Sequence, residues 1–241
     1  MTVYFISDVH LGLGGRAEER AKEDLLLGFL DHALPTASGL VIVGDLFDFW
    51  FEYGTVIPKG FHRTLTALQK YTDTGVPVHY LAGNHDFWMD DFFPAELGVH
   101  VYSGPVELLL GGKRVFLHHG DGLAPNDLGY RLIKPVLRHR WSIRLYRWLH
   151  PDIGVPLARG SSQSSREYTS RKKFGEGEGM AAFAAGKIRS GVDIVVMGHR
   201  HTPELVVMGE GTYVNLGDWI THRTYGVLRD GVITLQRWNG G

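Results

Sequence analysis

The stretch Gly83-Asn84-His85-Asp86-Phe87-Trp88 places an amide, an imidazole and a carboxylate side by side, directly before two large aromatic residues. Gly, Asn and Asp favour turns for backbone reasons alone, so the cluster is compatible with an ordinary polar turn after a buried strand. The same side chains are also compatible with one corner of a metal site. Which of the two interpretations holds depends on whether the rest of the chain supplies further metal ligands.

Four further clusters of acidic or imidazole side chains follow segments that have the apolar pattern of buried strands. The carboxyl ends of strands form the binding crevice of α/β sheets, so clusters at five such ends can converge on one place. One cluster alone has an ordinary explanation in a polar strand end that meets solvent, whereas five together favour a shared site. The five clusters are Asp8–His10, Asp45–Asp48, Asn84–Asp86, His118–Asp121 and His199–His201.

The order of the predicted elements indicates the fold class. Strands and helices alternate in the first part of the chain, and hairpins dominate the last part. This order predicts an α/β (α+β) fold with layered sheets and with helices on the outside. Strands are predicted at 2–7, 40–43, 76–81, 106–110, 115–118, 192–197, 212–216, 225–229 and 232–238, and helices at 18–33 and 62–72.

The segment Pro125 to Met180 interrupts this pattern, because it lacks strand-like alternation. Two helices are predicted within it, one at 127–149 with a kink at Pro135 and one at 164–173. We therefore interpret the segment as an inserted cap. The predicted domains are a core of residues 1–124 and 181–241 and a helical cap insertion of residues 125–180.

The cap carries 11 Lys and Arg residues against five Asp and Glu residues, a local excess of six positive charges. These basic residues alternate with Trp141, Ile143, Leu145 and Trp148. The combination suits an interfacial helix that meets anionic headgroups and acyl chains. A stripe of this kind is equally typical of a helix that packs its apolar face on the core, so both interpretations stay open.

The composition excludes several classes of function. The 241 residues are 44% hydrophobic and carry a formal net charge of -1, so no global field attracts nucleic acid, and no nucleic-acid or protein partner is expected. The absence of cysteine excludes disulfides, thiolate catalysis and cysteine-type zinc sites. Met1 to Asp8 lacks the pattern of a signal peptide, and no stretch approaches the ~20 apolar residues of a membrane span. We therefore expect a cytoplasmic protein.

The side chains of the five clusters favour particular metals. Carboxylates and imidazoles with an amide suit manganese, iron or zinc. One ion cannot use so many ligands, but two ions ~3.5–4 Å apart that share a carboxylate can, and such pairs typically serve hydrolysis at phosphorus. The expected cofactors are two divalent metal ions, with Mn²⁺ favoured and Fe or Zn as alternatives. The predicted reaction is cleavage of a phosphoester or pyrophosphate.

The series DxH, GDxxD, GNHD, HHGD and GHxH, spread from Asp8 to His201, resembles the motifs of the calcineurin-like metallophosphoesterases. The resemblance implies a four-layer αββα sandwich with two metals held between two sheets, and it implies that Asp45 bridges the metals. The implied ligands are Asp8, His10, Asp45 and His201 for one metal and Asp45, Asn84, His119 and His199 for the other.

Two catalytic residues are predicted in the segment GNHDFW (83–88). His85 is expected to stand beside the substrate phosphate, where it stabilises phosphoryl charge and protonates the departing oxygen. Asp86 is expected to set the tautomer of His85. Asp48 and Asp121 are expected to orient ligating imidazoles rather than bind metal.

His118 and His119 are consecutive residues at the end of a predicted strand. Successive strand residues face opposite sides of a sheet, so the two rings cannot both reach the metals. The family pattern favours His119 as the ligand.

A narrower resemblance is carried by FISDVHLG (5–12), GDLFDFWF (44–51), GNHDFW (83–88) and VNLGDW (214–219). These segments resemble the UDP-2,3-diacylglucosamine pyrophosphohydrolases of the lipid A pathway. That family cleaves a nucleotide-sugar lipid to UMP and 2,3-diacylglucosamine 1-phosphate (lipid X). The resemblance implies a peripheral location on the cytoplasmic face of the inner membrane. The implied substrate contacts in the cap are Asp127, Tyr130, Arg159, Ser165 and Arg166.

One departure from this narrower family keeps alternatives open. Its best-known members have Arg after the motif Asn, and this chain has His85. The first alternative is a soluble metal-dependent phosphodiesterase or nucleotide pyrophosphatase that acts on a non-lipid substrate. The second is a non-catalytic binding module with the same fold, which the presence of His85 and of every implied ligand disfavours.

Overall fold

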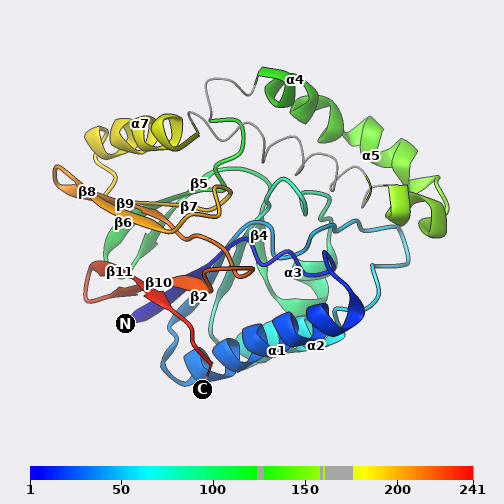
Figure 1. Ribbon diagram of the computed structural model, residues 1–241, viewed down its shortest axis with the longest axis horizontal. Helices are drawn as coiled ribbons and strands as arrows, with labels where there is room; N and C mark the ends of the chain where they lie inside the picture. The colour runs from blue at the N-terminus through cyan, green and yellow to red at the C-terminus, as the bar shows by residue number, and fades with distance from the viewer. Residues whose placement is uncertain (124–127, 158–159, 161–175, 241) are drawn as a thin grey trace.

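The computed structural model describes residues 1–123, 128–157, 160 and 176–240. Two sheets lie face to face at the centre of the molecule, with helices on both outer faces (Figure 1). The larger sheet has the order β11-β10-β1-β2-β3-β4, and the smaller has the order β5-β6-β7-β9-β8. The strands are β1 (Thr2–Ile6), β2 (Gly39–Val43), β3 (Val78–Leu81), β4 (His100–Tyr102), β5 (Val106–Leu110), β6 (Lys113–His118), β7 (Ile194–Met197), β8 (Glu204–Met208), β9 (Gly211–Asn215), β10 (Thr224–Arg229) and β11 (Val232–Arg237).

Both sheets are mixed, and a run of parallel strands occupies the centre of each and reaches one edge of the larger sheet at β4. β1, β2, β3 and β4 run parallel in the larger sheet, and β6, β7 and β9 run parallel in the smaller. The antiparallel strands β5 and β8 form the two edges of the smaller sheet. The motif residues therefore follow the carboxyl ends of central strands, where side chains from several strands can meet.

Three helices cover the outer face of the larger sheet: α1 (Arg16–Ala33), α2 (His62–Asp73) and α3 (Phe92–Leu97). Alternate residues of β1 face opposite layers, as strand geometry requires. Tyr4 and Ile6 belong to the same apolar cluster as Phe29 of α1, whereas Val3 and Phe5 belong to the cluster between the sheets. Both faces of this central strand are thus buried, which explains its continuous apolar run.

The helix α7 (Glu176–Arg189) covers the outer face of the smaller sheet. Its residues Met180 and Ala184 form an apolar cluster with Phe116 of β6 and Val195 of β7. The order of layers is therefore helix, sheet, sheet, helix, and the predicted αββα sandwich is confirmed (Figure 1). The predicted boundary between cap and core at 180/181 lies inside α7.

The first half of the cap forms two helices rather than the single kinked helix predicted at 127–149. α4 (Leu128–Leu137) contains Pro135 and ends two residues after it, and α5 (Arg140–Arg147) begins after His139. The His139 ring accepts a hydrogen bond from the backbone N–H of Trp141, so this residue caps a new helix. A further helical segment follows at residues 151–157. The helix predicted at 164–173 lies outside the described residues.

Candidate metal centre

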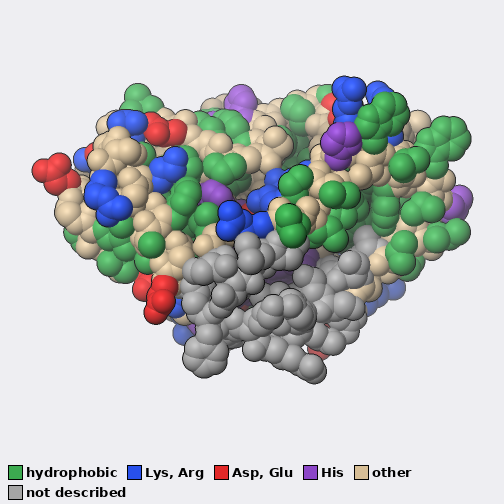
Figure 2. Space-filling model, turned by 90° about the horizontal axis from the view of Figure 1, so that it is seen from above, with side chains coloured by type: hydrophobic (Ala, Val, Ile, Leu, Met, Phe, Trp, Pro, Cys, Tyr) green, Lys and Arg blue, Asp and Glu red, His purple; other side chains and the backbone are tan. Residues whose placement is uncertain are grey.

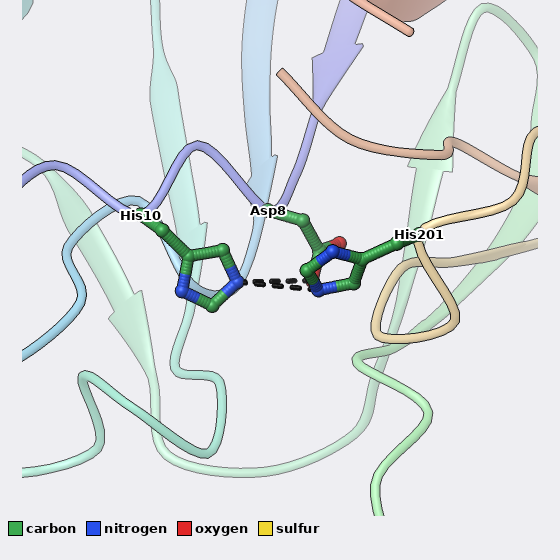
Figure 3. A group of neighbouring side chains, drawn as sticks. All are labelled: Asp8, His10 and His201. Atoms are coloured by element: carbon green, nitrogen blue, oxygen red, sulfur yellow. Dashed lines mark hydrogen bonds and ion pairs between the residues drawn. The ribbon is translucent and has the colours of Figure 1, made fainter. Parts of the chain in front are cut away.

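The first predicted ligand set converges at the ends of β1, β2 and β7. Figure 3 shows Asp8, His10 and His201 with their polar atoms directed toward one another. The Nε2 atoms of His10 and His201 lie 3.3 Å apart, and Nε2 of His201 lies 3.4 Å from Oδ1 of Asp8. Oδ2 of Asp45 lies 3.7 Å from Nε2 of His10. Four ligand atoms thus surround one point.

The second predicted set lies beside the first and shares Asp45 with it. Oδ1 of Asn84 lies 2.9 Å from Nε2 of His119 and 2.9 Å from Nδ1 of His199. Oδ2 of Asp45 lies 3.2 Å from Nε2 of His119. All seven predicted ligands are therefore brought together, and Asp45 stands between the two sets.

Neighbouring acceptors lie close to Nδ1 of three of the imidazoles. Nδ1 of His119 lies 2.8 Å from the carbonyl oxygen of Val43, which can only accept, so Nδ1 donates and Nε2 carries the lone pair. Nδ1 of His10 lies 3.4 Å from Oδ1 of Asp48 but has no hydrogen-bond partner among the described residues, so the orienting role predicted for Asp48 stays a prediction. In each ring the other nitrogen is the one that faces the ligand set.

Sequence reasoning missed Asp218, which orients the third imidazole. Its Oδ2 lies 3.5 Å from Nδ1 of His201, and its Oδ1 accepts hydrogen bonds from the backbone N–H groups of Thr221 and His222. The sequence contained a signal for this residue. Asp218 is the acidic residue of VNLGDW and follows the strand β9, just as the five predicted clusters follow five other strands.

The electrostatics of the cluster suit cations. Burial raises the pKa of Asp45, but neighbouring His119, His85 and His10 outweigh it and hold that pKa well below its usual range. Burial lowers the pKa of His201, but Asp218 and Asp8 outweigh it and raise that pKa to about 10. Oδ1 of buried Asp8 has no hydrogen-bond partner among the described residues, a costly state that a bound cation would relieve. The residues present therefore fit a divalent metal site.

The backbone of the ligands is unusual. Non-glycine residues rarely adopt positive φ, and strained backbone of this kind gathers at functional sites. Seven such residues occur in the described chain, and five of them are predicted ligands. The five are Asp8 (φ 54°), His10 (φ 50°), Asp45 (φ 54°), His199 (φ 67°) and His201 (φ 58°).

Two motif glycines allow the carboxylates to approach the backbone closely. A Cβ atom on Gly83 would collide with the Asp45 carboxylate, and one on Gly198 would collide with the Asp8 carboxylate. The glycines of GNHD and GHxH thus leave the space that the two buried carboxylates fill.

His85 lies at the edge of the first ligand set. Its backbone N–H donates to Oδ1 of Asp45 over 2.9 Å, and its ring packs edge-on against His10 with the centroids 4.8 Å apart. Ligand atoms of His85, His10 and Asp45 lie within 4.8 Å of one another. The predicted catalytic imidazole is therefore beside the candidate metal site.

The predicted role of Asp86 is corrected by its hydrogen bonds. Asp86 is fully buried, and its carboxylate accepts from Tyr80 Oη over 2.6 Å and from the backbone N–H of Gly83 over 2.8 Å. Among the described residues, the hydrogen bond of the His85 ring goes to the carbonyl oxygen of Asp48 at 3.2 Å. The hydrogen bonds of Asp86 fix the Gly83–Asp86 turn. The Asp48 carbonyl, and not Asp86, therefore sets the tautomer of His85.

His118 and Asp121 lie beside the metal ligands in the HHGD motif. The His118 ring accepts from the backbone N–H of Gly120 and lies 5.5 Å from the Phe183 ring of α7, so it faces away from the cluster. Oδ2 of Asp121 pairs with Nζ of Lys134 over 2.6 Å. This ion pair links the HHGD motif to the cap, and the orienting contact predicted between Asp121 and a ligating imidazole stays a prediction.

The predicted substrate contacts in the cap cannot be placed. Asp127, Arg159, Ser165 and Arg166 lie outside the described residues, and Tyr130 lies in α4 with its side chain outside them. These five residues stay predictions. In the described part of the chain, no helix has both the length and the apolar content that crossing a membrane requires.

Known proteins resemble this chain over nearly its whole length. A relative named UDP-2,3-diacylglucosamine hydrolase from Porphyromonas gingivalis (strain ATCC BAA-308 / W83) is 34% identical, over 97% of this chain and 96% of its own. Relatives of the same name from Stenotrophomonas maltophilia (strain R551-3) and Pseudomonas putida (strain F1) are 31% and 33% identical, over 91% and 90% of this chain and the same shares of their own.

The sequence model of the family described as calcineurin-like phosphoesterase matches residues 1–203. This range contains all seven predicted ligands and ends two residues after the last of them, His201. The motifs, the αββα layers and the Asp/His cluster agree with this match. The chain belongs to the calcineurin-like phosphoesterase family.

Proposed function

We propose that this hydrolase cleaves the diphosphate of UDP-2,3-diacylglucosamine to give UMP and 2,3-diacylglucosamine 1-phosphate. One observation carries the proposal: the likeness to proteins named for this activity covers 97% of the chain, and so includes the cap as well as the metal centre. A likeness confined to the core would support phosphoester hydrolysis in general but would not indicate which substrate is hydrolysed.

Two divalent metal ions, with manganese favoured, are the proposed cofactors. The first would bind Asp8, His10 and His201, the second would bind Asn84, His119 and His199, and Asp45 would contact both. The distances within the two sets and the shared position of Asp45 support this assignment. Bound metals would neutralise phosphate charge and activate water for attack at phosphorus.

His85 is the proposed catalytic residue among the side chains. The Asp48 carbonyl holds a proton on Nδ1 of the ring and thereby directs the other nitrogen, Nε2, away from Asp48. Burial lowers the pKa of His85, which makes its imidazolium form a stronger acid. In that form both nitrogens donate, so Nε2 would stabilise a phosphoryl oxygen and pass its proton to the departing oxygen. The place of His85 beside His10 and Asp45 supports this role.

The cap of residues 125–180 is proposed to hold the diacylglucosamine part of the substrate, with Asp127, Tyr130, Arg159, Ser165 and Arg166 as contacts. Acyl chains need apolar surroundings, since each buried methylene contributes ~0.8 kcal/mol. The apolar composition of α4, and the apolar side chains of Trp141, Ile143 and Leu145 among the arginines of α5, support the assignment.

The same cap is proposed to place the protein on the cytoplasmic face of the inner membrane as a peripheral protein. Trp148, Leu132 and Leu145 are 89%, 77% and 71% exposed. Figure 2 shows apolar side chains gathered with basic ones on the side of the molecule that carries α5. An exposed face of mixed apolar and basic residues supports contact with an anionic lipid surface over packing on the core.

The proposal is tested by following UMP release from UDP-2,3-diacylglucosamine by the purified protein with Mn²⁺. UDP-N-acetylglucosamine and bis(p-nitrophenyl) phosphate serve as substrates without acyl chains. We expect fast, chelator-sensitive release restricted to the acylated substrate. Cleavage of the small diesters alone would contradict the lipid assignment and favour a soluble phosphodiesterase or nucleotide pyrophosphatase.

A further inference from the structure

Two basic residues of the cap reach into the core. Nζ of Lys134 in α4 lies 2.6 Å from Oδ2 of Asp121, and Arg138, directly after α4, donates over 2.8 Å to the carbonyl oxygen of Gly83 and over 2.7 Å to that of Ser103. The two cations are spaced four residues apart, so they project from the same side of the helix. We call Lys134 and Arg138 the cap clamp.

The cap clamp joins loops that come from different sheets. Gly83 follows β3 of the larger sheet, and Asp121 follows β6 of the smaller sheet. Each loop carries one ligand of the second metal set: Asn84 is adjacent to Gly83, and His119 lies two residues before Asp121. The distance of 2.9 Å between Oδ1 of Asn84 and Nε2 of His119 depends on how these two loops meet.

The C-terminal end of α4 also contacts the two aromatic residues of the segment GNHDFW (83–88). The guanidinium carbon of Arg138 lies 5.0 Å from the centroid of the Phe87 ring, and Nε1 of Trp88 donates over 2.9 Å to the carbonyl oxygen of Leu137. Both ends of GNHDFW, the Gly83 carbonyl and the rings of Phe87 and Trp88, thus contact the cap. The loop that presents Asn84 is fixed from outside the core.

The cap clamp differs from an ordinary surface ion pair. Its side chains are 28% and 22% exposed and Asp121 is 4% exposed, whereas the ion pair of Lys70 and Asp31 on α2 and α1 is 57% and 66% exposed. Desolvation makes a buried ion pair a weak source of stability, and fixing one specific arrangement is its better attested use.

We propose that Lys134 and Arg138 are positioning residues for the second metal set. They hold the Asn84 loop against the His119 loop, so that the cap is part of the metal centre's framework as well as a substrate cover. The inference rests on the two-metal assignment of the proposed function, and it is independent of the substrate assigned there.

The test is a titration of metal-free protein with Mn²⁺, followed by electron paramagnetic resonance. In Arg138→Gln and Lys134→Gln we expect the affinity for the second equivalent to fall roughly 10- to 100-fold, the cost typical of removing an outer partner of metal ligands. The first equivalent should bind as in the native protein, and the signal of a coupled manganese pair should give way to that of isolated ions. Lys70→Gln removes a Lys–Asp ion pair of similar length, 2.8 Å, and should change neither equivalent.

An unchanged second affinity in Lys134→Gln and Arg138→Gln would overturn the inference, and so would an equal loss in Lys70→Gln. Should Arg138→Gln fail to fold, Lys134→Gln alone decides, since it leaves the carbonyl contacts of Arg138 in place. If the native protein binds two Mn²⁺ ions, loses the second in the clamp variants and never releases UMP, the clamp stands and the substrate assignment falls. If it binds only one ion, the two-metal assignment falls and the clamp with it.

Discussion

The core buries polar groups and the cap exposes apolar ones. Asp8, Asp45 and His119 are at most 2% exposed, whereas nine of the 16 exposed large hydrophobic residues of the described chain lie between residues 132 and 157. Each arrangement is unfavourable for a protein alone in water. Each would become favourable with a particular partner, a cation in the core and an apolar molecule at the cap. The proposed function accordingly assigns the chemistry to the core and the recognition of substrate to the cap.

The largest expected effect comes from removing the shared carboxylate of the core. Asp45→Ala should lower hydrolysis of every substrate at least about a thousandfold, because losing several kcal/mol of metal-based stabilisation costs that much in rate. Metal content, measured on the purified variant, should fall with it. Asp31→Ala, a change at an exposed aspartate, is the control. Activity within about tenfold of native would contradict a central role for Asp45.

Removing the imidazole beside the ligands should leave the metals and lower the rate. We expect His85→Ala to reduce kcat by ~10² or more for lipid and small substrates alike, because it removes proton transfer and a phosphoryl contact. Metal content separates two roles: two ions retained supports catalysis, whereas loss of an ion makes His85 a ligand. A decrease below about threefold with full metal content would refute the catalytic role.

The proposed affinity of the cap for lipid can be tested by a binding measurement that does not depend on enzyme activity. Trp148→Glu should weaken binding to phosphatidylglycerol vesicles by about tenfold or more, since burying a large apolar side chain is worth roughly 1.5–3 kcal/mol. Sedimentation with vesicles measures the effect. Val207→Glu on β8, at a site 71% exposed, alters a comparable apolar surface remote from the cap and should bind vesicles as the native protein does. Equal losses in both variants would mean that the cap has no special affinity for lipid.

The smallest effect is expected at a site that belongs to neither function. His79 on β3 stacks on His100 with the ring centroids 5.2 Å apart, and burial, with His100 adding to it, lowers the pKa of His79 below its usual 6.5. The unfolded chain therefore binds more protons, so the stability contribution of His79 is present above pH 6.5 and is lost as the pH falls below it.

Urea unfolding at several pH values, compared between the native protein and His79→Gln, measures this loss. The variant should have a flatter dependence of the free energy of unfolding on pH, while His62→Gln, at an exposed histidine, should follow the native curve. A native curve as flat as that of His79→Gln would contradict the shift.

The convergence of the candidate ligands could be predicted from sequence because every one of them follows a short apolar run that is recognisable as a buried strand. Asp8, Asp45 and His199 each come within three residues of such a strand, and parallel neighbours bring these positions together. Layered sheets with helices on the outside followed from the same alternation of strands and helices, and the resemblance of the motifs to the calcineurin-like metallophosphoesterases implied the αββα order. Local pattern and tertiary arrangement agree in this part of the chain.

Contacts between distant segments could not be predicted. Arg138 reaches Gly83 across 55 positions of sequence, and no local pattern marks the pairing. The short elements α3 and β4 were missed because six and three residues carry too little periodicity to distinguish them from loop. Helix α4 was expected to continue through residue 149, but the His139 cap, a hydrogen bond from the Trp141 N–H, starts a separate helix there.

The left-handed backbone of the ligands has a consequence for the life of the protein in a cell. Each such non-glycine residue stores on the order of 1–3 kcal/mol of strain, and five of them lie in one buried cluster of carboxylates and imidazoles. Because a ligand that binds only the folded state stabilises it, we expect the metal-free chain to unfold more often and to be degraded sooner. The abundance of this protein would then follow the supply of metal, so that a starved cell loses the enzyme itself and not only its activity.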